Sequence, residues 1–223
     1  MSYNVNFLFL LDYWDALLEG LMTTLGITGL CLILGLGLGF VVALLRLSSN
    51  PVVKAVTTLY VEFFRGTPVL IQLFWIFFCL PLILGFEISN FVSAVIALTL
   101  YMGAIVSETF RSSLRAIEKD QMDACVALGI GGFTKIFYVI LPQAILRAIP
   151  TLLSNSVSLF KESALVSVVG MSDLMYIGQN ISSVTFKPVE MLTAVAVIYF
   201  LIAFPLTRSV SWVERKLIHK IAL

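Results

Sequence analysis

Four long runs without a charged residue dominate this sequence. They contain 26, 21, 20 and 17 residues and lie between Glu19 and Arg46, Arg65 and Glu87, Glu87 and Glu108, and Glu190 and Arg208. A helix needs about 20 apolar residues to cross the hydrocarbon core of a bilayer, with a range of about 17 to 25. Charged residues make up only 12% of the chain, against about a quarter in water-soluble domains. The sequence therefore predicts an all-α integral membrane protein.

A fifth span is irregular. The apolar run 148–160 has 13 residues before Lys161 and Glu162, and apolar sequence then resumes through Gly170. We interpret this region as one span with an ion pair inside it or near its outer end. We expect a single transmembrane domain, residues 1–223, with spans at about 20–45, 60–84, 88–110, 147–169 and 190–211.

The basic residues orient the chain. With the N-terminus outside, the cytoplasmic segments hold 12 of the 14 Lys and Arg residues, and the outer connections hold only Lys187. Because positive charges gather on the cytoplasmic side of membrane proteins, we expect the N-terminus outside and the C-terminus in the cytoplasm. The first twenty residues contain no Lys or Arg, so no secretory signal peptide is expected. A net charge of +1 gives no indication of a nucleic-acid partner.

Several kinds of chemistry find no support in the sequence. The three cysteines are isolated and there is one histidine, so neither a disulfide framework nor a metal site is predicted. No G-x-x-x-x-G-K-[S/T] phosphate loop occurs, so this chain is not expected to hydrolyse ATP by the usual route. The paired residues of an intramembrane enzyme are also missing, and we expect no catalytic residues. Gly35 and Gly39 form a small-x-x-x-small pattern that predicts close helix packing.

The longest inner connection, 112–146, contains a predicted short helix. Residues 121–128 are helix formers, and Asp120 or Asp123 can cap or charge the start of the helix. Gly129 offers the left-handed conformation that ends a helix. The predicted object is a helix of about two turns that projects from the membrane and ends in a sharp return.

A second amphipathic run, 133–141, follows, and we expect Pro142 to end it, because proline disrupts a helix interior. Small side chains at Ala124, Cys125 and Ala127 allow the close approach of another surface. The pattern fits two interpretations equally: a docking site for a soluble partner, or a hairpin lying on lipid headgroups.

This segment resembles the EAA loop in the permease subunits of binding-protein-dependent ABC importers. Asp123-Ala124-Cys125, Gly129 and Ile140-Leu141-Pro142 have the spacing of that loop, with Asp in place of Glu and Cys in place of the second Ala. Other stretches resemble the polar amino-acid branch of the family, which includes the histidine, glutamine, arginine and cystine permeases. These stretches are Phe64–Pro68, Ser107–Arg111, Leu141–Ala144 and Asn155–Leu165.

The resemblance implies a five-helix type I importer permease with a cytoplasmic coupling helix, in the bacterial inner membrane. Two permease subunits pair, as a homodimer or with a related chain. A cytoplasmic dimer of ABC ATPase subunits binds ATP and Mg²⁺, and an extracytoplasmic binding protein delivers a polar amino acid. The permease chain itself needs no cofactor. The residues that would couple to the ATPase are Asp123, Ala124, Cys125, Leu128, Gly129, Leu141 and Pro142.

The irregular span carries a polar stripe. Thr151, Asn155, Ser158 and Glu162 are spaced 4, 3 and 4, which puts them on one helical face. An ionised group at mid-bilayer costs about 2.5–3.5 kcal/mol on insertion scales, so the stripe indicates a water-accessible or protein-lined pathway. The candidate pathway residues are Asn155, Ser158, Lys161, Glu162, Ser163 and Glu108.

Lys161 and Glu162 have two interpretations. In the first, Lys161 faces the α-carboxylate of a substrate and Glu162 faces its ammonium group. Neighbouring helical residues point about 100° apart, so both reach one ligand only if the helix breaks here. In the second, Lys161 snorkels to the outer headgroups and Glu162 is solvated. The 14 residues from Arg147 to Lys161 rise roughly 21 Å, short of the roughly 30 Å core, which favours a site in the outer half of the membrane.

Two charges near the inner surface also remain open to two interpretations. Glu108 has Arg111 at i+3, so it fits a surface ion pair or a pathway role. Arg65 fits snorkelling or a gate. The alternative function for the whole chain is a small ion-coupled carrier or channel that uses the polar stripe without an ATPase.

Overall fold

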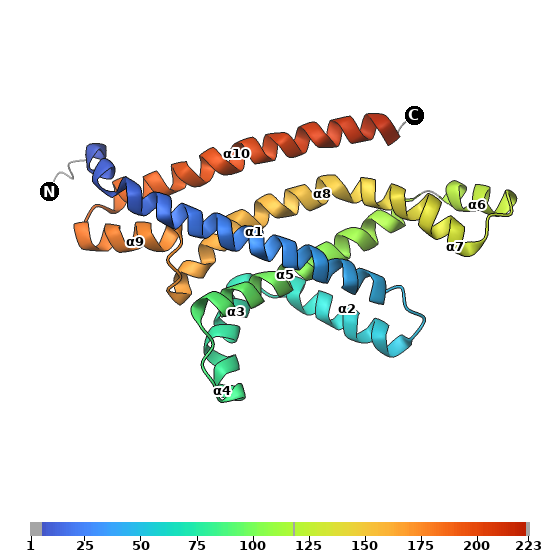
Figure 1. Cartoon of the computed structure of the whole chain (residues 1–223), viewed down its shortest axis with the longest axis horizontal. Coiled ribbons are helices and arrows are strands. Elements are labelled where there is room, and N and C mark those ends of the chain that lie inside the picture. Colours follow the sequence, from blue (N-terminus) through green and yellow to red (C-terminus); the bar gives the residue numbers. More distant parts are fainter. Residues whose placement is uncertain (1–5, 118, 222–223) are drawn as a thin grey trace.

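The computed structural model describes residues 6–117 and 119–221, and every regular element in this part is a helix. Residues 1–5, 118 and 222–223 of the expected domain lie outside the described residues. The long helices run side by side along one axis, with the N-terminal end and α9 at one end of the bundle and α6 and α7 at the other (Figure 1). Four helices are long and apolar enough to span a membrane, and one bent pair supplies a fifth span. The predicted all-α, five-span architecture is confirmed.

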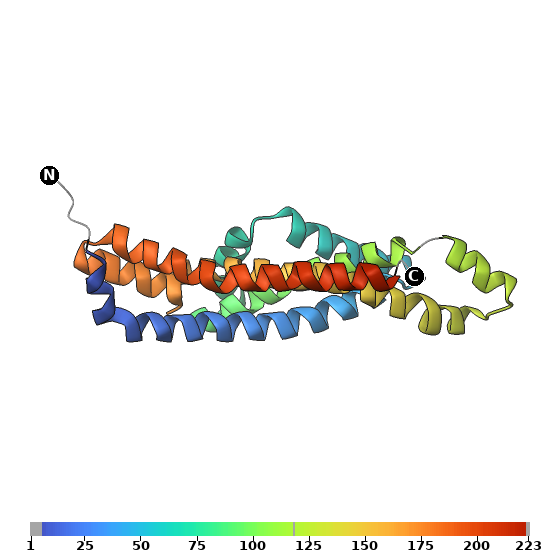
Figure 2. The ribbon, with the colours of Figure 1, turned by 90° about the horizontal axis from the view of Figure 1, so that it is seen from above.

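The centre of the bundle is the contact between α1 (Trp14–Leu45) and α5 (Asn90–Arg115). A Cβ atom at Gly35 would lie 2.7 Å from Met102, and one at Gly39 would lie 2.5 Å from Val106. The two backbones therefore approach more closely than larger residues allow, which confirms the predicted packing face. Figure 2 shows α1 along one side of the bundle and α2 along the other, with α10 in front.

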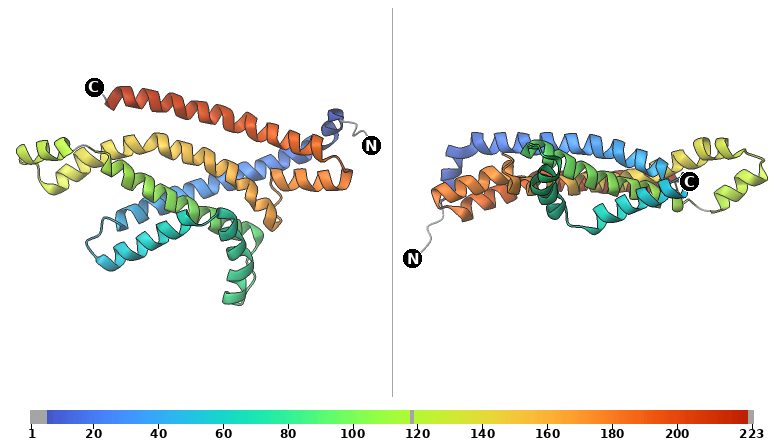
Figure 3. Two further views of the ribbon diagram at one scale, coloured as in Figure 1. Left: turned by 180° about the vertical axis from the view of Figure 1, so that it is seen from behind. Right: turned by 90° about the horizontal axis from the view of Figure 1, so that it is seen from below.

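The second span is broken. A bend of 109° separates α2 (Pro51–Gly66) from the arm 69–84, which consists of α3 (Val69–Phe74), a π-helical turn (Trp75–Cys79) and α4 (Leu80–Leu84). Thr67 is extended, as expected for a residue before proline. The Gln72 Nε2 donates to the carbonyls of Phe64 (2.8 Å) and Thr67 (3.0 Å), which braces the bend. The arm points away from the bundle (Figure 3), so the expected span 60–84 is not a straight helix.

The irregular span belongs to a helix that runs without interruption from Gly132 to Val169. It comprises α7 (Gly132–Thr134), a π-helical segment (Lys135–Ile140), α8 (Leu141–Glu162) and a 3-10 segment (Ser163–Val169). The expectation that Pro142 ends the run 133–141 is wrong. Proline usually disrupts a helix because it has no N–H and crowds the preceding turn. Here the preceding turn belongs to the π-helical segment, whose wider turn gives the proline ring room, so the helix continues.

The outer connection contains a helix that was not predicted from the sequence, α9 (Leu174–Thr185). Asp173 caps it by accepting from the backbone N–H groups of Met175 (3.2 Å) and Tyr176 (2.9 Å). Thr24 of α1 accepts a 3.0 Å hydrogen bond from Leu174 N. The last helix, α10 (Pro188–Ile221), then returns along α8.

Candidate functional site: a polar pathway and a cytoplasmic hairpin

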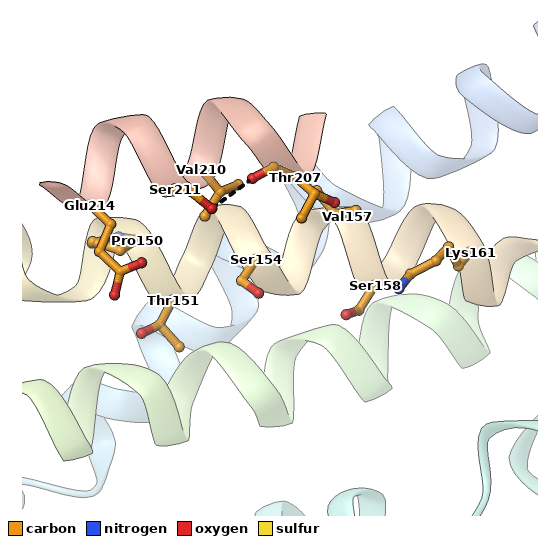
Figure 4. A pocket seen from close by; sticks show the side chains of 10 residues that line it. All are labelled: Pro150, Thr151, Ser154, Val157, Ser158, Lys161, Thr207, Val210, Ser211 and Glu214. Atoms are coloured by element: carbon orange, nitrogen blue, oxygen red, sulfur yellow. Dashed lines mark hydrogen bonds between the residues drawn. The ribbon is translucent and has the colours of Figure 1, made fainter. Parts of the chain in front are cut away.

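A polar hollow of about 360 Å³ lies between α8 and α10 and is called the α8–α10 hollow below. Lys161 and Glu214 lie at its opposite ends, with hydroxyl groups between them (Figure 4). Hydroxyl and charged groups are poorly matched to hydrocarbon, so this surface is unsuited to lipid tails. The lining residues are Pro150, Thr151, Ser154, Val157, Ser158, Lys161, Thr207, Val210, Ser211 and Glu214.

The α10 side of this hollow was missed from the sequence. Thr207, Ser211 and Glu214 are spaced 4 and 3, so they share one helical face. The hydroxyls of Thr207 and Ser211 donate to the carbonyls four residues earlier, at 2.8 and 3.3 Å. Their remaining lone pairs stay available as acceptors. The same spacing argument that found the stripe on α8 would have found this second stripe.

A second hollow, of about 450 Å³, lies between α2, α5 and α8 and is called the Arg65 hollow. The Nδ2 of Asn155 donates a 3.1 Å hydrogen bond to the Thr109 hydroxyl, which joins α8 to α5. Thr151 lines both hollows, so the two are neighbours along α8. The polar residues of the Arg65 hollow are Arg65, Tyr101, Glu108, Thr109, Ser112, Thr151 and Asn155.

Lys161 and Glu162 face different neighbours. Lys161 lines the α8–α10 hollow, whereas Glu162 Oε1 accepts a 2.9 Å hydrogen bond from the Tyr101 hydroxyl on α5. Glu162 Oε2 is buried and has no hydrogen-bond partner among the described residues. The α-helix tightens into a 3-10 helix directly after Glu162, but the helix does not break there. In this conformation the two charges are not brought together.

Ser163, a predicted pathway residue, lines neither hollow. It is fully buried, and its hydroxyl donates to the Phe160 carbonyl at 2.7 Å. Ser163 directly follows Glu162, so its side chain points about 100° away from the α8 stripe. Ser158 lines the α8–α10 hollow and Asn155 lines the Arg65 hollow.

Glu108 is the centre of an ion-pair cluster. Arg111 donates to both carboxylate oxygens, and Arg46 Nη1 donates to Oε2 at 2.9 Å. Arg65 Nη1 lies 3.8 Å from the same oxygen. The expected Arg111 pair is present, whereas the other two contacts were not predicted because they come from α1 and α2. Both oxygens of Glu108 are thus engaged by the chain itself.

The segment expected to be cytoplasmic forms a hairpin, residues 119–140, that projects past the ends of the neighbouring helices (Figure 1). Its first helix, α6 (Lys119–Ala127), is followed by Gly129 with a φ of +67°, as the sequence predicted. The N–H of Ile130 donates to the Cys125 carbonyl at 2.9 Å and closes the helix end. We call this element the coupling hairpin, after the role that the sequence resemblance implies for it.

The coupling hairpin exposes some predicted contact residues and hides one. Leu128 is 77% exposed, and Asp123 and Ala124 are also exposed. Cys125 is 4% exposed, so its side chain is buried and is not part of the outer surface that a partner would contact. Leu141 and Pro142 belong to the continuous helix behind the hairpin. Arg147 Nη1 donates to the Ala116 carbonyl at 2.5 Å and ties that helix to the end of α5.

Among the described residues, no group of three or more His, Cys, Asp or Glu side chains could hold a metal ion. The described features are therefore a multi-span helical bundle, polar hollows along α8 and a projecting hairpin. Together they are typical of a transport subunit of the membrane.

Comparison with known proteins identifies the family. Residues 35–219 match the family described as "Binding-protein-dependent transport system inner membrane component", and the chain belongs to it. It is 38% identical to the arginine transport system permease protein ArtQ of Bacillus subtilis (strain 168), over 90% of this chain and 92% of that protein. It is 34% identical to the putative glutamine transport system permease protein GlnP of Rickettsia felis, over 95% and 99% of the two chains. The chain is an amino-acid ABC importer permease subunit.

Solved structures agree on the fold. A crystal structure of an amino acid ABC transporter with histidines superposes with a TM-score of 0.92 at 34% identity, covering 96% of this chain and all of that chain. The inward-facing MetNI methionine ABC transporter superposes with a TM-score of 0.76 at 21% identity, covering 92% and 98%, which supports the fold alone.

Proposed function

We propose that this chain forms the translocation pathway for a polar amino acid in an ATP-driven importer of the bacterial inner membrane. An extracytoplasmic binding protein delivers the amino acid, and a separate ATPase dimer, which binds ATP and Mg²⁺, drives the transport cycle. Relatives named for arginine and glutamine transport make these two amino acids the first substrates to test.

The polar route along α8 is the observation that carries this proposal. Thr151, Ser154, Ser158 and Lys161 line a hollow that opens at the surface of the chain between two spanning helices. A polar surface at membrane depth is tolerated where it faces protein or a water-filled cavity. We therefore assign a second permease subunit, either the same chain or a related one, to cover this side and enclose the pathway.

The coupling hairpin supplies the contact with the ATPase. Leu128 and Asp123 are exposed at its tip region, whereas Cys125 and the hairpin base are packed within the chain. A rigid, closed helix end with an exposed leucine suits insertion into a groove of a soluble partner. The side chains of Ile117, Ile140 and Ala144 pack together at the base, so a force on the hairpin reaches α5 and α8.

The first experiment tests the energy source. The permease, its ATPase and its binding protein are reconstituted in liposomes, and uptake of labelled L-arginine and L-glutamine is measured with ATP or with an ion gradient alone. ATP-dependent uptake of either amino acid supports the proposal. Uptake driven by the ion gradient without the ATPase would instead support an ion-coupled carrier.

The second experiment tests the docking site. The substitution Asp123→Arg reverses a charge on the coupling hairpin, and Glu87→Arg makes the same change in the outer connection between α4 and α5. We expect Asp123→Arg to release the ATPase in a pull-down while the permease stays in the membrane, and Glu87→Arg to retain it. If both variants hold the ATPase equally, the hairpin is not the docking site.

A further inference from the structure

Arg65 is the member of the Glu108 cluster whose hydrogen-bond donors remain unused. Arg111 and Arg46 occupy both oxygens of Glu108 with direct hydrogen bonds. Arg65 Nη1 stops 3.8 Å from Oε2, beyond hydrogen-bond distance. In the described residues no side chain or carbonyl accepts a hydrogen bond from this guanidinium, and its side chain is 41% exposed.

The cluster as a whole has excess positive charge. Three guanidinium groups surround one carboxylate, and Glu62, which interacts electrostatically with Arg111, is the other acid nearby. At least one positive charge is therefore unbalanced, and of the three arginines it is Arg65 that lines the Arg65 hollow. A planar guanidinium with free donors is matched in shape and charge to a carboxylate, which it binds through two parallel hydrogen bonds.

The rest of the hollow offers groups that suit an ammonium. Because Asn155 uses its Nδ2 to donate to Thr109, its carbonyl oxygen is left as an acceptor. Thr151 adds a hydroxyl, and it also lines the α8–α10 hollow, so the two hollows adjoin at this residue of α8. The volume of about 450 Å³ lies within the range of roughly 300–1,000 Å³ for small-molecule sites.

We propose that the Arg65 hollow is a second substrate site, nearer the cytoplasm, in which Arg65 binds the α-carboxylate of the amino acid and Asn155 and Thr151 receive its ammonium group. This inference rests on the proposed transport function and adds a second binding site along the translocation pathway. Glu108 also lines the hollow, but Arg46 and Arg111 already engage both of its carboxylate oxygens. It holds Arg46 and Arg111 and keeps Arg65 at the mouth of the hollow.

Binding to the purified permease–ATPase complex, without the binding protein, tests the site. The probes are L-arginine and agmatine, which is arginine without its carboxylate, together with L-glutamine and its decarboxylated amide. The wild-type complex should bind an amino acid but not the matching amine. Arg65→Gln should weaken amino-acid binding about 10- to 100-fold, the effect of losing a hydrogen-bonded pair of charges. Arg65→Lys should retain part of it.

Arg208→Gln is the matched control, because Arg208 on α10 packs over Phe204 and lines neither hollow. It should bind like the wild type. Co-purification of the ATPase and an unchanged elution volume show that each variant is assembled. Equal binding of the amine and the amino acid, or equal binding by Arg65→Gln and Arg208→Gln, would overturn the proposal.

Repeating the measurement in nanodiscs of phosphatidylcholine, alone and with phosphatidylglycerol, distinguishes a substrate site from a lipid-headgroup site. An Arg65 effect seen only with the anionic lipid would overturn the proposal in favour of a headgroup site. If the wild-type complex shows ATP-driven uptake but Arg65→Gln changes nothing, only this second site fails. If the wild-type complex neither transports nor binds an amino acid, the proposed function fails with it.

Discussion

The hydroxyl of Tyr101 on α5 donates a 2.9 Å hydrogen bond to the carboxylate of Glu162 at the last α-helical residue of α8. This bond joins the two pathway helices at the point where α8 tightens into a 3-10 helix. The other oxygen of Glu162 is buried without a partner among the described residues. Under the proposed function, an opening of the bundle that exposes this oxygen would let it accept a hydrogen bond from the ammonium group of the substrate.

The first prediction concerns Glu162. Replacing Glu162 with Gln removes its charge while keeping its size, so we expect ATP-driven uptake to fall about 10-fold, which corresponds to about 1.4 kcal/mol. The amount of co-purified ATPase should stay unchanged. Tyr101→Phe and the double variant complete a mutant cycle. If the residues act together, the double variant is no worse than Glu162→Gln. Normal uptake by Glu162→Gln would remove Glu162 from the pathway.

The second prediction concerns the contact between α1 and α5. Gly39→Ala places a methyl group 2.5 Å from Val106, so the helices must separate, at a cost of about 1–3 kcal/mol. Gly37→Ala is the control, because nothing lies within 4 Å of its added Cβ. We expect the temperature at which the purified protein loses its monodisperse elution peak to fall for Gly39→Ala only. Equal stability of the two variants would contradict the packing described.

The third prediction concerns the turn of the coupling hairpin. Gly129 has a φ of +67°, where an L-residue costs about 1–2 kcal/mol. Gly131 has a φ of −60° and open space around it, so Gly131→Ala should be tolerated. We expect Gly129→Ala to weaken ATPase binding about 5- to 30-fold in a titrated pull-down. An unchanged affinity would show that ATPase binding does not depend on the conformation of this turn.

The fourth prediction concerns the Glu108 cluster. Glu108→Gln leaves three guanidinium groups without their shared counter-charge. Removing one partner of a buried pair costs roughly 3–5 kcal/mol, and we expect about 2–3 kcal/mol because Arg65 and Arg111 stay partly exposed. Glu62→Gln, which alters an exposed acid on α2, should have little effect on thermal stability. Comparable losses of thermal stability in both variants would argue that the Glu108 cluster does not specifically stabilise the packing of α1, α2 and α5.

The fifth prediction concerns pH and Asp173 in the outer connection. Burial raises the pKa of Asp173 to about 6, although two backbone N–H groups that favour its charged form bind it. The folded state therefore holds this proton more tightly than the unfolded state, and the stabilisation present below about pH 4 is lost as the pH rises through about 6. Two pKa units correspond to roughly 3 kcal/mol.

Asp173→Asn should abolish this pH dependence while keeping the cap of α9, because asparagine caps helices as well as aspartate does. The measurement compares the change in unfolding temperature between about pH 5 and pH 7 for the variant and the wild type. A variant that retains the full wild-type pH dependence would place the titrating group elsewhere.

Much of the fold follows from local signals in the sequence. The uncharged runs locate the spans because the bilayer fixes their length, and the Gly35 and Gly39 pattern predicts a closely packed face of α1, although not its partner. Gly129 marks the end of α6 because its backbone conformation is a local property. Each of these depends on residues that are close together in the chain, so no knowledge of the tertiary structure is needed.

The parts that were missed depend on neighbours distant in sequence or on how a helix absorbs a proline. The break at Thr67–Pro68 is stabilised by hydrogen bonds from Gln72. Pro142 follows a π-helical segment, and the presence of a proline does not by itself predict such a segment. The facing directions of Lys161 and Glu162 depend on α10 and α5. Of the candidate site, the stripe on α8 was predictable, whereas Arg46, Arg65 and Tyr101 needed the packed bundle.

The uninterrupted helix from Gly132 to Val169 has a mechanical consequence. Its 38 residues extend roughly 57 Å at 1.5 Å per residue, well beyond the roughly 30 Å of the hydrocarbon core. One end of this helix belongs to the coupling hairpin, and Lys161 and Glu162 lie toward the other end. The hairpin and these two charged residues are therefore parts of one continuous helix. Under the proposed function, a tilt imposed by the ATPases at the hairpin end would therefore move Lys161 and Glu162 directly, without any relay between separate parts.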